Sequence, residues 1–155
     1  MKNKYFEDAY LFLLIATFGI SLFIGIIVAP TIFGSELSFA DEVLTRFQEG
    51  LLMTTIFVKF NYILNFVIVI IIIFEIINYK NGIWDKLTFS AIFIFISTAL
   101  LFTNYYTPQI LELQSLEKTE GQIFDNLHFA SELDFKIFTF ALLFLIIRKL
   151  YLSRK

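Results

Sequence analysis

Residues 60–77 read FNYILNFVIVIIIIFEII, and this stretch decides the fold class. It holds one charged residue, Glu75, and approaches the roughly 20 apolar residues that an α-helix needs to cross a bilayer. Three further stretches have the same character: Ala9–Phe33, Leu87–Thr107 and Leu133–Ile147. The sequence therefore predicts an all-α, integral membrane four-helix bundle. We expect a single membrane domain over residues 1–155, with spans at about 9–33, 60–77, 87–107 and 133–147.

The composition also indicates a membrane protein. Of 155 residues, 58% are hydrophobic and 17% are charged, which leaves more apolar surface than a soluble domain of this size can hide. The absence of cysteine excludes disulfides and thiolate metal sites. A net charge of −2 gives no reason to expect a nucleic-acid partner. The expected partner is the lipid bilayer, and a homo-oligomer or a membrane-protein partner is compatible with so apolar a chain.

The distribution of basic residues predicts the orientation. Eight of the 12 basic residues lie at the two ends of the chain or between the second and third spans: Lys2, Lys4, Lys80, Lys86, Arg148, Lys149, Arg154 and Lys155. Because basic residues favour the cytoplasmic side, we expect both termini in the cytoplasm of a bacterium and a multi-pass protein of its inner membrane. The first apolar run exceeds the ~7–15 residues of a cleavable signal, so it is expected to be retained.

The two outer loops are expected to carry helical extensions of the second and fourth spans. Ser38 and Asp41 fit a capping box that starts a helix near Phe39. Pro30 and Pro108 stand where the first and third spans leave the membrane, and each is expected to kink or end its helix.

Small residues recur every four positions along the first span, at Thr17, Ser21, Gly25 and Ala29. Such a stripe lets helix backbones approach closely in lipid. Packing within the bundle, a homodimer seam and a narrow permeation path are the three interpretations, and packing is favoured.

Polar residues near the outer end of the second span form one group of candidates. Lys59 is followed by Asn61 and Asn65, which are one helical turn apart. Lys59 either extends its ammonium to the outer surface or takes part in a binding site. Asn61 and Asn65 either bond across helices or contribute to that site.

His128 is the one histidine, and Ser131 and Glu132 share its helix face. It either binds a metal or proton or, as favoured, ties the outer helix ends together by hydrogen bonds. One histidine, two methionines and no cysteine exclude a bis-histidine haem within a monomer, and we expect no cofactor and no metal. No catalytic motif occurs, so we do not expect an enzyme.

Three stretches together indicate a family. Residues 29–33 (APTIF), 105–108 (YYTP) and 124–131 (FDNLHFAS), with the pattern F-x-x-L-H-x-x-S in the last, resemble the transmembrane protein 205-like family. The resemblance implies a four-helix membrane protein without an established activity. The positions that match are Pro30, Phe33, Pro108, His128 and Ser131.

These observations favour a small inner-membrane protein of accessory or structural role with an outward-facing polar cluster. The alternative is a transporter or channel for an ion or small solute. That alternative would use Lys59, Asn61, Asn65 and His128 at an outer vestibule.

Overall fold

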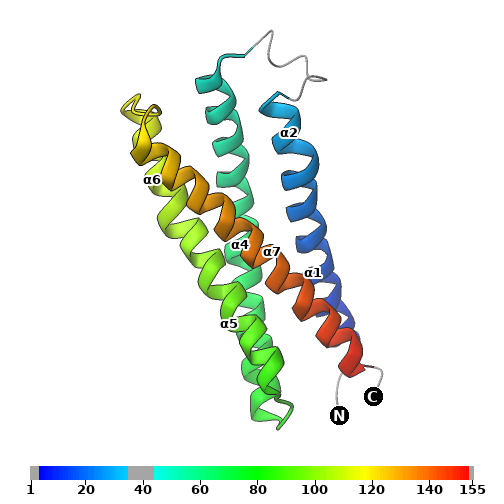
Figure 1. Ribbon diagram of the computed structural model, residues 1–155. Coiled ribbons are helices and arrows are strands. Elements are labelled where there is room, and N and C mark those ends of the chain that lie inside the picture. Colours follow the sequence, from blue (N-terminus) through cyan, green and yellow to red (C-terminus); the bar gives the residue numbers. More distant parts are fainter. Residues whose placement is uncertain (1–3, 35–43, 154–155) are drawn as a thin grey trace.

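Four helical segments make up most of the computed structural model, which describes residues 4–34 and 44–153 (Figure 1). The first is α1 (Lys4–Phe23), continued by the π-helical turn η1 (Ile24–Val28) and by α2 (Ala29–Ile32). The second is α4 (Arg46–Lys80). The third is α5 (Lys86–Leu101), continued by η2 (Phe102–Tyr106) and α6 (Thr107–Ser115), and the fourth is α7 (Gln122–Ser153). No strand occurs in the described residues, which confirms the all-α prediction.

Three of the four segments are long and apolar enough to cross a membrane: Lys4–Ile32, Arg46–Lys80 and Lys86–Ser115. α7 falls short because charged residues flank its apolar part, namely Glu132, Asp134 and Lys136 before it and Arg148 and Lys149 after it. Its passage through the membrane over residues 133–147 therefore stays a prediction. The outward-facing ring of Phe140, 70% exposed, is suited to lipid and supports it.

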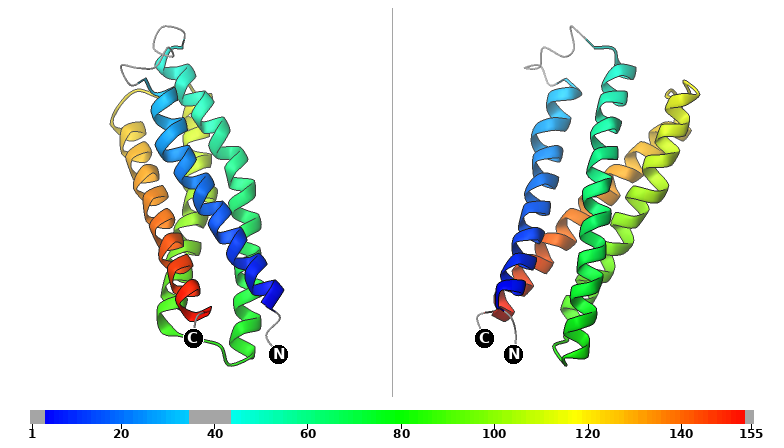
Figure 2. Two further views of the ribbon diagram at one scale, coloured as in Figure 1. Left: turned by 90° about the vertical axis from the view of Figure 1, so that its right-hand side faces the viewer. Right: turned by 180° about the vertical axis from the view of Figure 1, so that it is seen from behind.

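The helices form one bundle, and α7 runs obliquely across the other helices, in front of them in Figure 1 and behind them in the right view of Figure 2. It packs most extensively against α5 and also against α1. The start of α1 and the end of α7 lie close together, at the same end of the bundle as the α4–α5 turn. We call this the terminal end. The end of α2, the start of α4 and the α6–α7 connection lie at the opposite end, called the loop end.

Both predicted helical extensions are present at the loop end. α4 begins at Arg46 and α7 begins at Gln122, well before the apolar stretches that they continue into. Thr45 caps α4, and its side chain and that of Gln48 exchange reciprocal hydrogen bonds with each other's backbone N–H groups. The capping box expected at Ser38 and Asp41 lies outside the described residues.

The two prolines do not end their helices. A π-helical turn precedes each one, so that Ala29 N–H bonds to the carbonyl of Ile24 and Thr107 N–H bonds to that of Phe102. Proline cannot donate a hydrogen bond, and its ring clashes with the preceding turn of a regular helix. The wider π turn is a known local adjustment of the backbone, and here it accompanies each proline while the helix continues.

Aromatic rings fill the centre of the bundle. Phe95 and Phe138 are 0% exposed, and Phe138 packs edge-on to Phe95 and Phe102 with ring centroids 6.2 and 5.6 Å apart. The outward faces are equally apolar, since large side chains such as Phe12 and Phe93 are more than half exposed. A bundle that is apolar both inside and outside is expected of a protein whose solvent is lipid.

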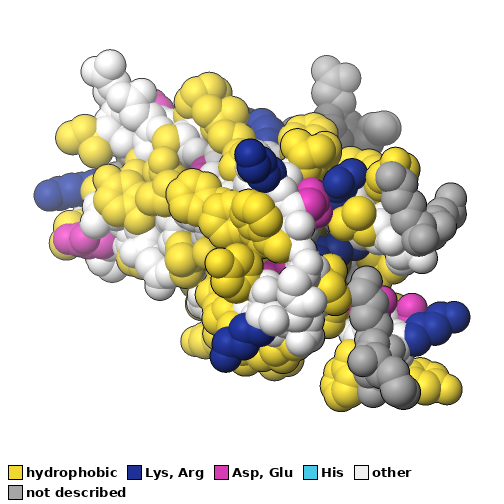
Figure 3. Space-filling view, turned by 90° about the horizontal axis from the view of Figure 1, so that it is seen from below, with side chains coloured by type: hydrophobic (Ala, Val, Ile, Leu, Met, Phe, Trp, Pro, Cys, Tyr) yellow, Lys and Arg dark blue, Asp and Glu magenta, His cyan; other side chains and the backbone are white. Residues whose placement is uncertain are grey.

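Polar contacts join the helices at the terminal end. Glu75 accepts a hydrogen bond from the Tyr10 hydroxyl (3.1 Å) and pairs with Lys149 at 2.5 Å, while Tyr10 stacks on Phe74. Glu75 thus links α1, α4 and α7. Seen from this end, charged side chains lie among broad hydrophobic areas (Figure 3).

Candidate functional site

A cavity of about 680 Å³ lies between the helices in the half of the bundle nearest the loop end. Gly25, Ala29 and Pro30 form its wall on the first segment, while residues of α4, α6 and α7 form the other walls. Aromatic rings of Phe57, Phe102 and Phe135 line its inner part. We refer to it as the inter-helix cavity.

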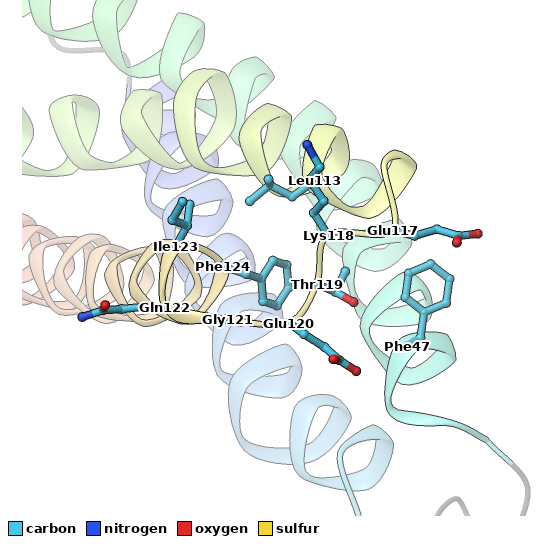
Figure 4. A pocket seen from close by; sticks show the side chains of 10 residues that line it. All are labelled: Phe47, Leu113, Glu117, Lys118, Thr119, Glu120, Gly121, Gln122, Ile123 and Phe124. Carbon is cyan, nitrogen blue, oxygen red and sulfur yellow. The ribbon is translucent and has the colours of Figure 1, made fainter.

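The mouth of the inter-helix cavity adjoins a shallow hollow of about 750 Å³ around the α6–α7 connection (Figure 4). The two spaces share Phe47, Thr119, Glu120 and Phe124. In Figure 4, Phe124 from α7 and Phe47 from α4 lie on either side of Thr119. Gly121 has a φ of +107°, which favours glycine, and lets the chain turn into α7 at this point.

Two buried polar contacts join helices beside the cavity. Gln114 of α6 donates from Nε2 to Thr54 Oγ1 of α4 at 3.0 Å. Asn61 of α4 donates from Nδ2 to Thr107 Oγ1 at 3.0 Å, directly after the π turn of the third segment. Gln114, Thr54 and Thr107 all line the cavity. The π turn therefore lies where α4 and the third segment exchange polar contacts.

His128 and Ser131 both line the inter-helix cavity, as their shared helix face predicted. The His128 ring stacks on Phe124 and meets the edge of Phe33 at 6.2 Å, and Nε2 lies 3.3 Å from Glu132 Oε1. Ser131 is buried and donates its hydroxyl to the carbonyl of His128. His128 thus connects the end of the first segment to α7 through ring contacts rather than through the hydrogen bonds that were favoured.

The other predicted site residues do not join this group. Lys59 and Asn65 are exposed on α4 and line neither the cavity nor its mouth. Asn61 is buried and reaches the cavity wall only through Thr107. The five candidate residues therefore separate into a lining pair, a supporting residue and two surface residues, because side chains one turn apart on a helix can still fall on either side of a packing boundary.

The structurally important residues of the sequence analysis are found where the cavity and the π turns meet. Gly25 lies beside the Phe135 ring, which a Cβ atom at this position would approach to 3.4 Å. Pro30 and Phe33 line the cavity, and Pro108 follows the second π turn. In the stripe of small residues, Thr17 and Ser21 are buried inside the bundle, whereas Gly25 and Ala29 line the cavity.

The comparisons with known proteins identify a family. The sequence of residues 12–119 matches the DUF4149 family, described as a domain of unknown function. The chain belongs to the DUF4149 family. No curated protein and no solved structure matches it. The resemblance to the transmembrane protein 205-like family is not tested by this match and stays a prediction.

The DUF4149 match covers both π turns and the Gln114–Thr54 pair, but it ends before α7. His128 and Ser131 therefore lie beyond the matched segment. Among the residues that the structure describes, no three histidine or acidic side chains lie together in a way that could hold a metal ion.

Sequence reasoning missed two buried polar groups of this family member. Glu49 is 1% exposed and lies 3.6 Å from Arg46 Nη1, and Gln114 is 4% exposed. Thr54 and Gln114 could have been noticed as polar residues that continue the apolar faces of their helices. The hydrogen bond between Gln114 and Thr54 could not have been predicted, because it depends on how α6 is rotated after the π turn.

Proposed function

We propose that this DUF4149 protein is an accessory, non-catalytic protein of the bacterial inner membrane that holds a small ligand in its inter-helix cavity. Apolar outward faces support residence in a bilayer, and the basic residues at the terminal end favour a cavity that opens away from the cytoplasm. A largely apolar pocket with a few polar groups is the usual form of a small-molecule site.

The closure of the cavity at its inner end is the observation that carries this proposal. Phe57, Phe102 and Phe135 line the inner wall, and Phe95 and Phe138 behind them are fully buried. An ion needs a polar or water-filled path through the membrane. Closely packed aromatic rings do not provide one, so binding is favoured over conduction.

A transporter is the rival function, and two buried carboxylates favour it. Glu49 Oε2 and Asp134 Oδ2 are buried and have no hydrogen-bond partner. Ionisable residues inside a membrane protein often mark an ion or proton pathway. Such a protein would need a second conformation in which the aromatic rings separate.

Flux measurements on the full chain in liposomes test the proposal. A pH-sensitive dye is trapped inside, a pH gradient and a potassium gradient are imposed in turn, and empty liposomes serve as the control. We expect the same leak with and without protein. Flux that saturates with the ion and that disappears in Asp134→Asn would overturn the accessory role and establish the transporter.

A further inference from the structure

Three hydroxyl groups on the wall of the inter-helix cavity offer a ligand only acceptor oxygens. The hydroxyls of Thr54, Thr107 and Ser131 donate to the carbonyls of Gly50, Phe102 and His128, at 2.7 to 2.8 Å. A hydroxyl carries one hydrogen, so each of these side chains has only lone pairs left for a ligand. These three hydroxyls therefore cannot donate to an anionic or carbonyl group of a ligand.

Gln114 adds an acceptor that has no partner. Its side chain is more than nine-tenths buried, it lines the cavity, and its Oε1 atom makes no hydrogen bond. The orientation of its amide follows from its neighbour: Thr54 already donates its hydrogen to Gly50, so it can only accept from Gln114. The amide nitrogen must face Thr54, and the oxygen is left without a partner beside the cavity.

Acidic side chains dominate the charge at the mouth. Arg46 lies beside the buried Glu49, and Lys136 pairs with Glu132 at 3.3 Å. Glu120 and Asp125 also line the cavity, and within the described residues neither forms an ion pair. The charged side chains that line the cavity are thus three acidic and two basic, an excess that favours a cation over an anion.

We propose that the inter-helix cavity binds an amphipathic primary ammonium compound, with the ammonium donating to Gln114 Oε1 and the apolar body lying among Phe57, Phe102 and Phe135. This inference rests on the proposed function and names the class of ligand. The cavity volume suits a molecule of drug-like size.

Three probes with the same apolar body test the ligand class. They are 4-phenylbutylammonium, 4-phenylbutanol and 4-phenylbutyrate, titrated calorimetrically into the full chain in phosphatidylcholine nanodiscs, a lipid whose headgroup has no N–H donor. Empty nanodiscs correct for partitioning into lipid. We expect the ammonium to bind about tenfold more tightly than the alcohol, as one charge-assisted hydrogen bond provides. The carboxylate should not exceed the empty-disc signal.

Two variants test the residues. Gln114→Met keeps the side-chain length but removes the acceptor, and should weaken ammonium binding about tenfold. Gln109→Met, at an exposed position of α6 that lines neither the cavity nor the hollow, is the matched control and should bind as the parent does. The pair Glu120→Gln and Asp125→Asn leaves Gln114 and its partner untouched, so it remains informative if Gln114→Met fails to fold. It should weaken binding of the ammonium but not of the alcohol.

The possible results distinguish a wrong ligand class from a wrong proposed function. Equal affinity for all three probes, tightest binding of the carboxylate, or unchanged ammonium affinity in a folded Gln114→Met would overturn the ligand class and leave a binding protein. Absence of binding by every probe would overturn both the ligand class and the ligand-holding function.

Discussion

Single residues connect the helices at the terminal end, and Asp85 is the clearest case. Its Oδ1 accepts from the backbone N–H groups of Leu87 and Thr88 at the start of α5, and it pairs with Arg148 of α7 at 3.2 Å. Burial by itself raises the pKa of Asp85. The hydrogen bonds from Thr88 and the charge of Arg148 outweigh that effect, so the pKa lies below its ordinary value.

A lowered pKa makes a pH-dependent prediction. The folded state stabilises the charged form of Asp85. The contribution of Asp85 to the free energy of unfolding is therefore complete above the ordinary pKa of about 4 and is lost as the pH falls below it. Asp85→Asn keeps an N-cap but removes the ion pair with Arg148. We expect its melting temperature in detergent to lie below that of the parent at pH 7 and to converge with it below pH 4. The exposed Asp8→Asn is the control and should follow the parent; a constant difference for Asp85→Asn across this range would contradict the argument.

At the scale of the helices, the notable feature is the π turn that precedes each of the two prolines. Pro30 and Pro108 were expected to kink or end two helices. Neither ends its helix, since each follows a π turn and the helix continues, to Ile32 after Pro30 and to Ser115 after Pro108. The third segment continues for the nine residues of α6, and this extension carries Gln114 to Thr54. The π turn thus accommodates the proline and also sets which face of α6 meets α4.

The stripe on α1 gives a prediction at the scale of helix packing. Ser21 is 0% exposed, whereas a Cβ atom at Gly19 on the same helix would meet nothing within 4 Å. Ser21→Leu must therefore force the helices apart, at a cost of about 1–3 kcal/mol, while Gly19→Leu adds an apolar side chain to an open surface. Thermal unfolding in detergent, followed by circular dichroism, should show a lower midpoint for Ser21→Leu alone. Equal midpoints for the two variants would mean that the stripe is not a tight contact.

At the scale of the whole molecule, the start of α1, the end of α7 and the α4–α5 turn lie at one end (Figures 1 and 2). The residues that line the cavity belong to the opposite half of the bundle. The basic residues predict that the terminal end is cytoplasmic. Closed packing around Phe138 separates this end from the inter-helix cavity. A ligand would then enter from the outer side, which makes the membrane orientation part of the function.

Topology reporters test the orientation directly. A fusion after Lys155 should be active only with a reporter that works in the cytoplasm, and an insertion beside Glu117 only with one that works outside. The apolar lengths of three segments and the basic bias give this expectation its physical basis. α7 is the one helix between Glu117 and Lys155. Activity of the same reporter at both positions would place them on the same side of the membrane and would show that α7 does not cross it.

The sequence by itself determined the helical class, the apolar stretches, and the helix that each candidate residue occupies. Those properties follow from local composition and from the spacing of residues along one helix. It also predicted that His128 and Ser131 share a face, which the cavity lining bears out. It could not separate Asn61 from Asn65, which differ in burial although they lie one turn apart.

Only the tertiary structure decided which polar groups meet. The pairing of Gln114 with Thr54 and of Glu75 with Lys149 joins residues from different helices. Such contacts depend on the rotation and crossing of each helix, and a single π turn shifts the rotation of everything after it. Periodicity records the faces of one helix, but it contains no information about the face of another helix that will lie opposite.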